Sequence, residues 1–178
     1  RILLSIILLL SGLFQAEAAY KPHKREFRGA WIQCVNGQFQ GMSPTDMQKT
    51  LTRQLDILQQ YGTNAIIFQV RAECDALYKS DIEPWSRYLT GRQGQAPTPY
   101  WDPLLWMVEQ CHKRGMEIHA WINPYRAKTK GTTELAANHI ARTHRARCFE
   151  YDGLYVLNPG IPEGSDKERA ENARWEHL

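Results

Sequence analysis

Apolar residues recur at helical spacing in two stretches, residues 43–62 and 102–115, and each stretch is followed by a short run that is almost continuously apolar. The runs are residues 65–70 and 118–122, and a similar run at 27–32 precedes both units. Each helical stretch opens with a capping residue and a proline and closes at a glycine, which are the expected start and stop signals. The pattern predicts strand, helix, strand, helix, strand.

Strands that are apolar on both faces are typical of a parallel sheet buried under helices, so the predicted fold class is α/β. Periodicity alone fits a doubly wound open sheet or the first part of a barrel. The connections after the second and third strands, residues 72–100 and 123–157, are long, whereas those before the strands are short. This asymmetry favours a barrel, whose functional loops gather at the carboxyl ends of the strands. The turn after the first strand offers only Gly37, which argues against a dinucleotide site.

The two ends of the chain differ from this middle part. Residues 2–14 are almost entirely apolar, follow Arg1 and precede a small-x-small site, which predicts a signal peptide over residues 1–19. We therefore expect export to the periplasm or the outside, with no stable membrane insertion after cleavage; an uncleaved anchor is the alternative. Residues 164–178 form an atypical charged tail, which indicates either that the domain stops there or that the reading frame was lost or truncated.

Charge and cysteines narrow the function further. The 22 Lys and Arg against 19 Asp and Glu leave a net charge of +3, too small an excess to favour a nucleic-acid partner. The four cysteines, at 34, 74, 111 and 148, show no C-x-x-C pair and no zinc spacing. We expect mainly free buried thiols; a Cys34–Cys74 bridge is the alternative, because both follow predicted strand ends. No His and acid run predicts a metal, and no motif implies a cofactor.

Polar and aromatic residues follow the second and third predicted strands. A sugar site needs flat aromatic faces and groups that can bond hydroxyls, and both are present at these strand ends. The candidate substrate-binding residues are Arg71, Asp75, His119, Trp121, Asn123, Tyr125 and Arg126. The structural alternatives are an Arg71–Asp75 ion pair, a core position for His119, and packing roles for Trp31, Trp101 and Trp106.

Several blocks of this sequence, in order, resemble the bacterial glycosyl hydrolase-like family 10. They are Arg28-Gly29-Ala30-Trp31 and the segments 68–78, 83–91, 112–126 and 157–162. The resemblance implies an exported (β/α)₈ glycosidase, with residues 20–163 supplying about three β/α units at its N-terminal end. One relative in that family cuts peptidoglycan glycan strands that have lost their peptides, so a cell-wall or other polysaccharide glycan is the implied substrate.

The resemblance also bears on catalysis. The family continues to a fourth strand that carries two aspartates, and nothing of that kind follows Glu163, so the catalytic residues are left unassigned. Glu73 and Asp75 receive substrate-binding or supporting roles, with Asp75 orienting Arg71 while Asn123 and His119 donate to the sugar. The family usually has glycine where this chain has Cys74. Two rival hypotheses are a non-catalytic carbohydrate-binding protein and a truncated product without function.

Overall fold

The computed structural model describes residues 26–161, so the predicted signal peptide and the charged tail lie outside the described residues. The first sheet contains β1 (Gly29–Ile32), β2 (Ala65–Arg71) and β3 (Glu117–Ile122), which are parallel and lie side by side in chain order. The three predicted strands and their parallel pairing are confirmed.

The helices between these strands begin where the capping signals lie. α2 (Pro44–Gln60) starts after Ser43, whose side chain accepts from the backbone N–H of Asp46, and α4 (Pro103–Lys113) starts after Asp102, which caps it in the same way. A single turn, α3 (Arg87–Thr90), lies in the long connection after β2. None of the helices within residues 26–161 combines the length and the apolar character that crossing a membrane requires.

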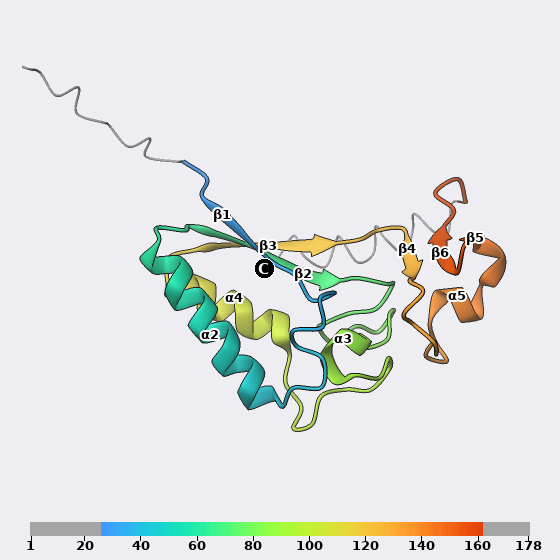
Figure 1. Cartoon of the computed structure of the whole chain (residues 1–178), viewed down its shortest axis with the longest axis horizontal. Helices are drawn as coiled ribbons and strands as arrows, with labels where there is room; N and C mark the ends of the chain where they lie inside the picture. Colours follow the sequence, from blue (N-terminus) through green and yellow to red (C-terminus); the bar gives the residue numbers. More distant parts are fainter. Residues whose placement is uncertain (1–25, 162–178) are drawn as a thin grey trace, which may run out of the picture.

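Both long helices cover the same face of the first sheet (Figure 1). Ile32, Ile66 and Phe68 point from the strands into a core that Leu51 of α2 and Met107 of α4 complete. This follows from the handedness of parallel crossovers, because two right-handed connections that step in the same direction place both helices on one side. The arrangement is compatible with part of a (β/α)₈ barrel.

Within residues 26–161, helices cover only this one face of the first sheet. On the other face, among the residues that the structure describes, Trp31 of β1 is 67% exposed, and Glu117 and His119 of β3 are also exposed. Trp31 therefore does not pack in the core, whereas Trp101 is buried against Trp106 as expected, with the two rings edge to face. The open face leaves aromatic side chains accessible on the first sheet.

A second sheet, which the sequence analysis did not predict, occupies the long connection after β3. It contains β4 (Arg126–Lys128), β5 (Cys148–Tyr151) and β6 (Leu154–Leu157), all antiparallel in the order β4-β6-β5. A short helix, α5 (Ile140–Thr143), and a 3₁₀ turn (Arg145–Arg147) precede β5. In Figure 1 the arrows of β2 and β3 point toward this sheet, so it lies beyond their carboxyl ends.

Candidate functional site

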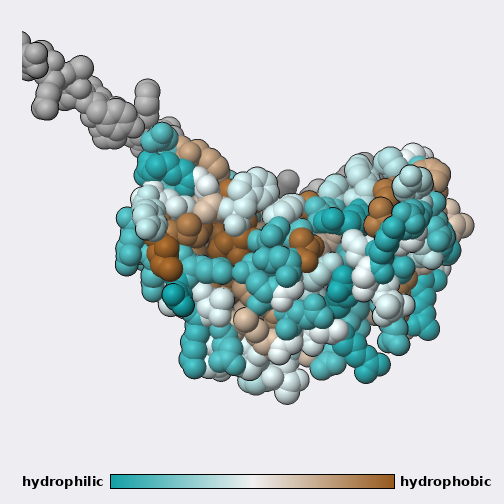
Figure 2. Space-filling model, in the orientation of Figure 1, coloured by the Kyte–Doolittle hydropathy of each residue, from teal (hydrophilic) through white to brown (hydrophobic). Residues whose placement is uncertain are grey.

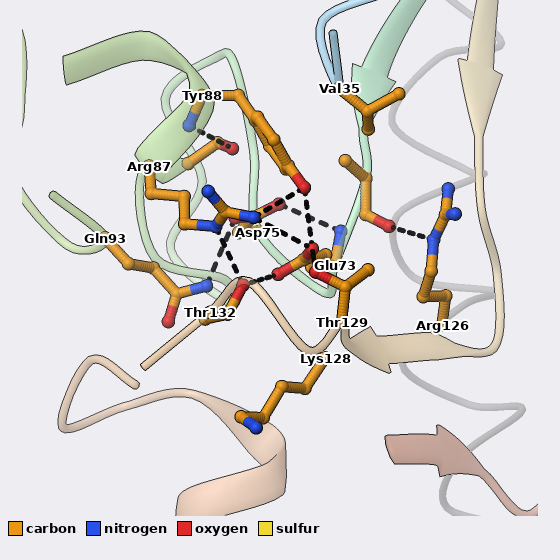
Figure 3. A network of polar contacts seen from close by, with 12 residues as sticks. Val35, Glu73, Asp75, Arg87, Tyr88, Gln93, Arg126, Lys128, Thr129 and Thr132 are labelled. Atoms are coloured by element: carbon orange, nitrogen blue, oxygen red, sulfur yellow. Dashed lines mark hydrogen bonds and ion pairs between the residues drawn. The ribbon is translucent and has the colours of Figure 1, made fainter. Parts of the chain in front are cut away.

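A buried carboxylate, Glu73, lies at the carboxyl end of β2 and joins the two sheets (Figure 3). Its Oε1 accepts from the hydroxyls of Thr129 at 2.6 Å and Tyr88 at 2.8 Å, and its Oε2 accepts from the hydroxyl of Thr132. The Arg87 guanidinium lies 3.5 Å from Oε1 and also donates to Thr132 at 2.7 Å. Glu73 therefore ties the segment after β4 to the loop after β2.

The protonation of this cluster follows from its hydrogen bonds. Burial opposes charge on Glu73, but three hydroxyl donors and the Arg87 cation outweigh it and hold the pKa of the carboxyl below its ordinary value. Burial and the neighbouring carboxylate raise the pKa of Tyr88 to about 12. At neutral pH Glu73 is thus a charged acceptor and Tyr88 a neutral donor.

Asp75 is fully buried two residues further on. Its Oδ1 accepts from the backbone N–H of Glu73 at 3.0 Å, and its Oδ2 accepts from Nε2 of Gln93 at 3.1 Å. Burial raises the pKa of this carboxyl despite these bonds. Asp75 fixes the backbone of the loop rather than facing an open site.

The partner of Arg71 is Glu83 and not Asp75, so the expected ion pair and the orienting role of Asp75 are wrong. Arg71 is buried and donates through Nε and Nη2 to the two carboxylate oxygens of Glu83, at 2.7 and 2.6 Å. Its Nη1 donates to the backbone carbonyls of Asn123 and Pro124, at 2.7 and 3.1 Å. The guanidinium is thereby occupied on every side that the structure describes.

Asn123 and Trp121 lie together at the end of β3. The Asn123 amide donates to the carbonyl of Ala72 at 3.3 Å, and its oxygen accepts from the indole N–H of Trp121 at 3.2 Å. Arg126 donates to the same Ala72 carbonyl through Nε at 3.1 Å. Asn123 therefore acts as a positioning residue, which holds the Trp121 ring against the loop after β2.

The other predicted residues, His119 and Tyr125, lie apart from the group formed by Trp121, Asn123 and Arg126. His119 projects from the open face of β3 with its side chain 48% exposed, and its Nε2 lies 3.2 Å from a carboxylate oxygen of Glu117. The alternative of a core position for His119 is therefore wrong. Tyr125 is exposed between β3 and β4. The structure thus brings Trp121, Asn123 and Arg126 together and places His119 further back along the sheet.

A groove of about 610 Å³ opens beside the edge strand β1, and Trp31 and Trp121 form part of its wall. The two indoles meet edge to face, with ring centroids 4.9 Å apart. The amide side chains of Gln33, Asn36 and Gln54 line the same groove. Its apolar part comes from α2 and β1, where Figure 2 shows hydrophobic surface. Its volume is that of a small-ligand site.

Gln69 supports the wall of this groove and was not among the residues predicted from the sequence. Gln69, opposite Trp121 on the neighbouring strand, is buried, and its Oε1 accepts from the backbone N–H groups of Cys34 and Val35 at 3.0 and 3.4 Å. Gln69 thereby fixes the chain where it leaves β1 and enters the groove wall. Its polar side chain within the otherwise apolar run of residues 65–70 was the available signal.

All four cysteines are free and buried, as expected. The thiol of Cys34 donates to Gln69, whereas that of Cys74 donates to the carbonyl of Arg126, so the alternative Cys34–Cys74 bridge is absent. Cys74 has a φ of +50°, the left-handed conformation that glycine adopts most readily. Within residues 26–161, no three His, Cys, Asp or Glu side chains gather in a group that could hold a metal ion.

The fold is that of an α/β protein, with a groove beside the edge strand of its parallel sheet. Residues 26–167 match the family described as Glycosyl hydrolase-like 10, so the chain belongs to this family. The chain is 38% identical over 175 residues to "Glycosyl hydrolase YngK" of Bacillus subtilis (strain 168), a match that covers 93% of this chain and 33% of the relative.

It is also 33% identical over 170 residues to "Glycosyl hydrolase DigH" of Escherichia coli (strain K12), covering 84% of this chain and 38% of that protein. The protein of the same name from Shigella flexneri matches equally well. The chain therefore spans little more than a third of the length of these curated relatives.

Proposed function

We propose that this chain is part of an exported glycoside hydrolase that acts on a bacterial cell-wall polysaccharide, and that residues 26–161 supply glycan-binding surface. Membership of the glycosyl hydrolase-like family supports a glycosidase-type activity. The predicted signal peptide over residues 1–19 supports export and, with it, access to the cell wall.

The observation that carries the proposal is the groove beside β1. Trp31 and Trp121 present indole faces and edges on which a pyranose ring can stack, and the amides of Gln33 and Asn36 can donate to and accept from hydroxyls and N-acetyl groups. The hydrogen bonds of Asn123 hold the Trp121 ring in place, so little conformational freedom is lost when a sugar binds.

The acidic residues near this edge support the structure and do not cleave glycosidic bonds. Glycoside hydrolysis requires two carboxyl groups that flank the scissile bond. Glu73, Asp75 and Glu83 are all buried and bonded to neighbouring side chains or backbone. We assign these three carboxylates to supporting the loop after β2. The same observation favours a second candidate, a non-catalytic carbohydrate-binding protein.

The test uses the full chain and peptidoglycan glycan strands freed of their peptides. We expect the chain to bind these strands in a co-sedimentation assay, and Trp121→Ala to weaken binding about tenfold, because one stacking ring is worth on the order of 1 kcal/mol or more. Tyr61→Ala is the matched control, since this exposed aromatic follows the last residue of α2 and does not line the groove.

Release of new reducing ends in the same mixtures separates the two candidates. New ends that depend on the wild-type chain support the hydrolase, whereas binding without them supports the carbohydrate-binding protein. Failure of the wild-type chain to sediment with the strands contradicts both.

A further inference from the structure

The outer face of the second sheet carries exposed aromatic residues that no core covers. Phe149 of β5 is 59% exposed, Tyr151 of β5 is 78% exposed, and Val156 of β6 is also exposed. Phe149 lies directly opposite Val156 in the antiparallel ladder, so the two side chains share a face. Their neighbours in sequence, Cys148 and Leu157, point to the other side and belong to the small second core.

This face is continuous with the end of β3. Val156 is also paired with Arg126 of β4, so Arg126, Val156 and Phe149 form one row across three strands. Two strand spacings separate the ends of the row, a span of about 10 Å, which is comparable to a disaccharide. At its inner end, Arg126 donates to the Ala72 carbonyl that also holds Asn123. The row therefore starts at the candidate site and runs outward.

The guanidinium of Arg126 keeps part of its hydrogen-bonding capacity. Within the described part of the chain, its bond to Ala72 runs through Nε, and no Asp or Glu forms an ion pair with it. The two terminal nitrogens can therefore bind a carboxylate in the two-point geometry that arginine favours. The guanidinium of Arg71, by contrast, is paired at two points with the carboxylate of Glu83.

Charge is distributed unevenly between the two sheets. Residues 123–161 contain six Lys and Arg against three Asp and Glu, a net charge of +3, whereas residues 26–122 contain nine against ten, a net charge of −1. A polyanion is thus attracted to the second sheet and not to the first. Exposed aromatic rings combined with an unpaired guanidinium match a sugar polymer that carries carboxylates.

We propose that Arg126, Phe149, Tyr151 and Val156 form an acidic-glycan platform, on which a carboxylate-bearing polysaccharide strand lies as it leaves the groove. Arg126 binds a sugar carboxylate, while Phe149 and Tyr151 stack on pyranose rings further along the strand. The inference rests on the proposed glycan-binding function and deepens it, because it names acidic polysaccharide as the ligand class. A protein surface that covers the face, including a second copy of this chain, is the rival occupant.

The experiment is affinity electrophoresis of the full chain, which measures how far polygalacturonate in the gel retards its migration. Neutral chitin oligosaccharides, added in solution as a competing ligand, report binding of an uncharged glycan. We expect Phe149→Ser and Tyr151→Ser each to weaken retardation by polygalacturonate about tenfold, with binding to the neutral oligosaccharide unchanged. Arg126→Gln should lower both the affinity and its dependence on salt. Tyr61→Ser, just after α2, and Arg53→Gln, on α2, are matched controls for an exposed aromatic and an exposed cation.

The outcomes separate this inference from the proposed function. Loss of glycan-strand binding in Trp121→Ala, with polygalacturonate retardation unchanged in both platform variants, overturns the platform and leaves the groove. Loss in the platform variants alone supports the platform and contradicts the groove. A wild-type chain that binds no glycan overturns both. If Phe149→Ser abolishes self-association in sedimentation velocity without altering retardation, the face is an interface between copies of the chain, and the platform is overturned. Circular dichroism melts of every variant confirm that it folds.

Discussion

Arg71 and Glu83 form a two-point ion pair in the interior, with Nε to Oε2 at 2.7 Å and Nη2 to Oε1 at 2.6 Å. Both side chains are almost completely inaccessible to solvent. Because Arg71 also donates to the carbonyls of Asn123 and Pro124, this pair joins the ends of β2 and β3 to the loop between α3 and β2. It is therefore a structural element of the edge that carries the groove.

Glu83→Gln should destabilise the chain strongly. The substitution leaves a buried guanidinium without its counter-charge, and breaking a buried pair in this way costs about 3–5 kcal/mol. Asp152→Asn is the matched control, because it breaks the pair between Lys130 and Asp152 at an exposed hairpin, where the expected cost is about 0–1 kcal/mol. Urea unfolding followed by circular dichroism gives both values. Equal losses in the two variants contradict the structural role.

The identity of this partner shows what the sequence could not indicate. Glu83 becomes the neighbour of Arg71 because the loop after β2 doubles back: Ala76 bridges to Arg71 on one side and to Trp85 on the other. That path depends on backbone contacts among residues with no periodic pattern. The helices, by contrast, were predictable, since local caps at Ser43 and Asp102 fix their starts.

Asp75 should make the stability of the chain fall as pH rises above about 4. Its pKa is raised in the folded state because burial disfavours the charged carboxylate. The folded chain therefore holds a proton that the unfolded chain has released, so stability is greatest below the unfolded pKa and declines as pH rises through the folded pKa. Each unit of separation between the two pKa values costs about 1.4 kcal/mol.

Asp75→Asn removes this titration and tests the sign. We expect the free energy of unfolding of the wild type, relative to that of the variant, to decrease as pH rises above about 4. Glu73, whose lowered pKa gives stability that is lost on acidification, is present in both chains and cancels in the difference. Urea titrations at several pH values provide the comparison; curves that stay parallel contradict the prediction.

The second sheet and the open face were missed for different reasons. The hairpin formed by β5 and β6 had a signal in the sequence, because Asp152-Gly153 separates two apolar runs. Both residues adopt positive φ in the structure, at 49° and 76°. The open face had none. Trp31 and Trp121 have the same apolar pattern whether a strand is buried on one side or on two, so the pattern does not indicate which face α2 and α4 cover.

Export is testable with the first part of the chain. Residues 1–19, given an initiator Met and fused to alkaline phosphatase, which is active only outside the cytoplasm, should produce phosphatase activity in the periplasm. A matched fusion that carries Leu8→Arg and Leu9→Arg interrupts the apolar run and should be inactive. Activity that is equal in both fusions, or absent from both, contradicts a signal peptide.

The thiols should be inert in the folded chain and countable in the unfolded chain. Burial raises the pKa of all four thiols, of Cys74 to about 12 and of Cys111 to about 11. At about pH 8, fewer than roughly one in a hundred of the Cys111 thiols are thiolates, the nucleophilic form, so labelling by a disulfide reagent should wait for the chain to open. In guanidinium chloride all four should react at once. A count of two after unfolding reveals a disulfide and contradicts the free buried positions, whereas rapid labelling of the folded chain shows that one of these thiols is accessible.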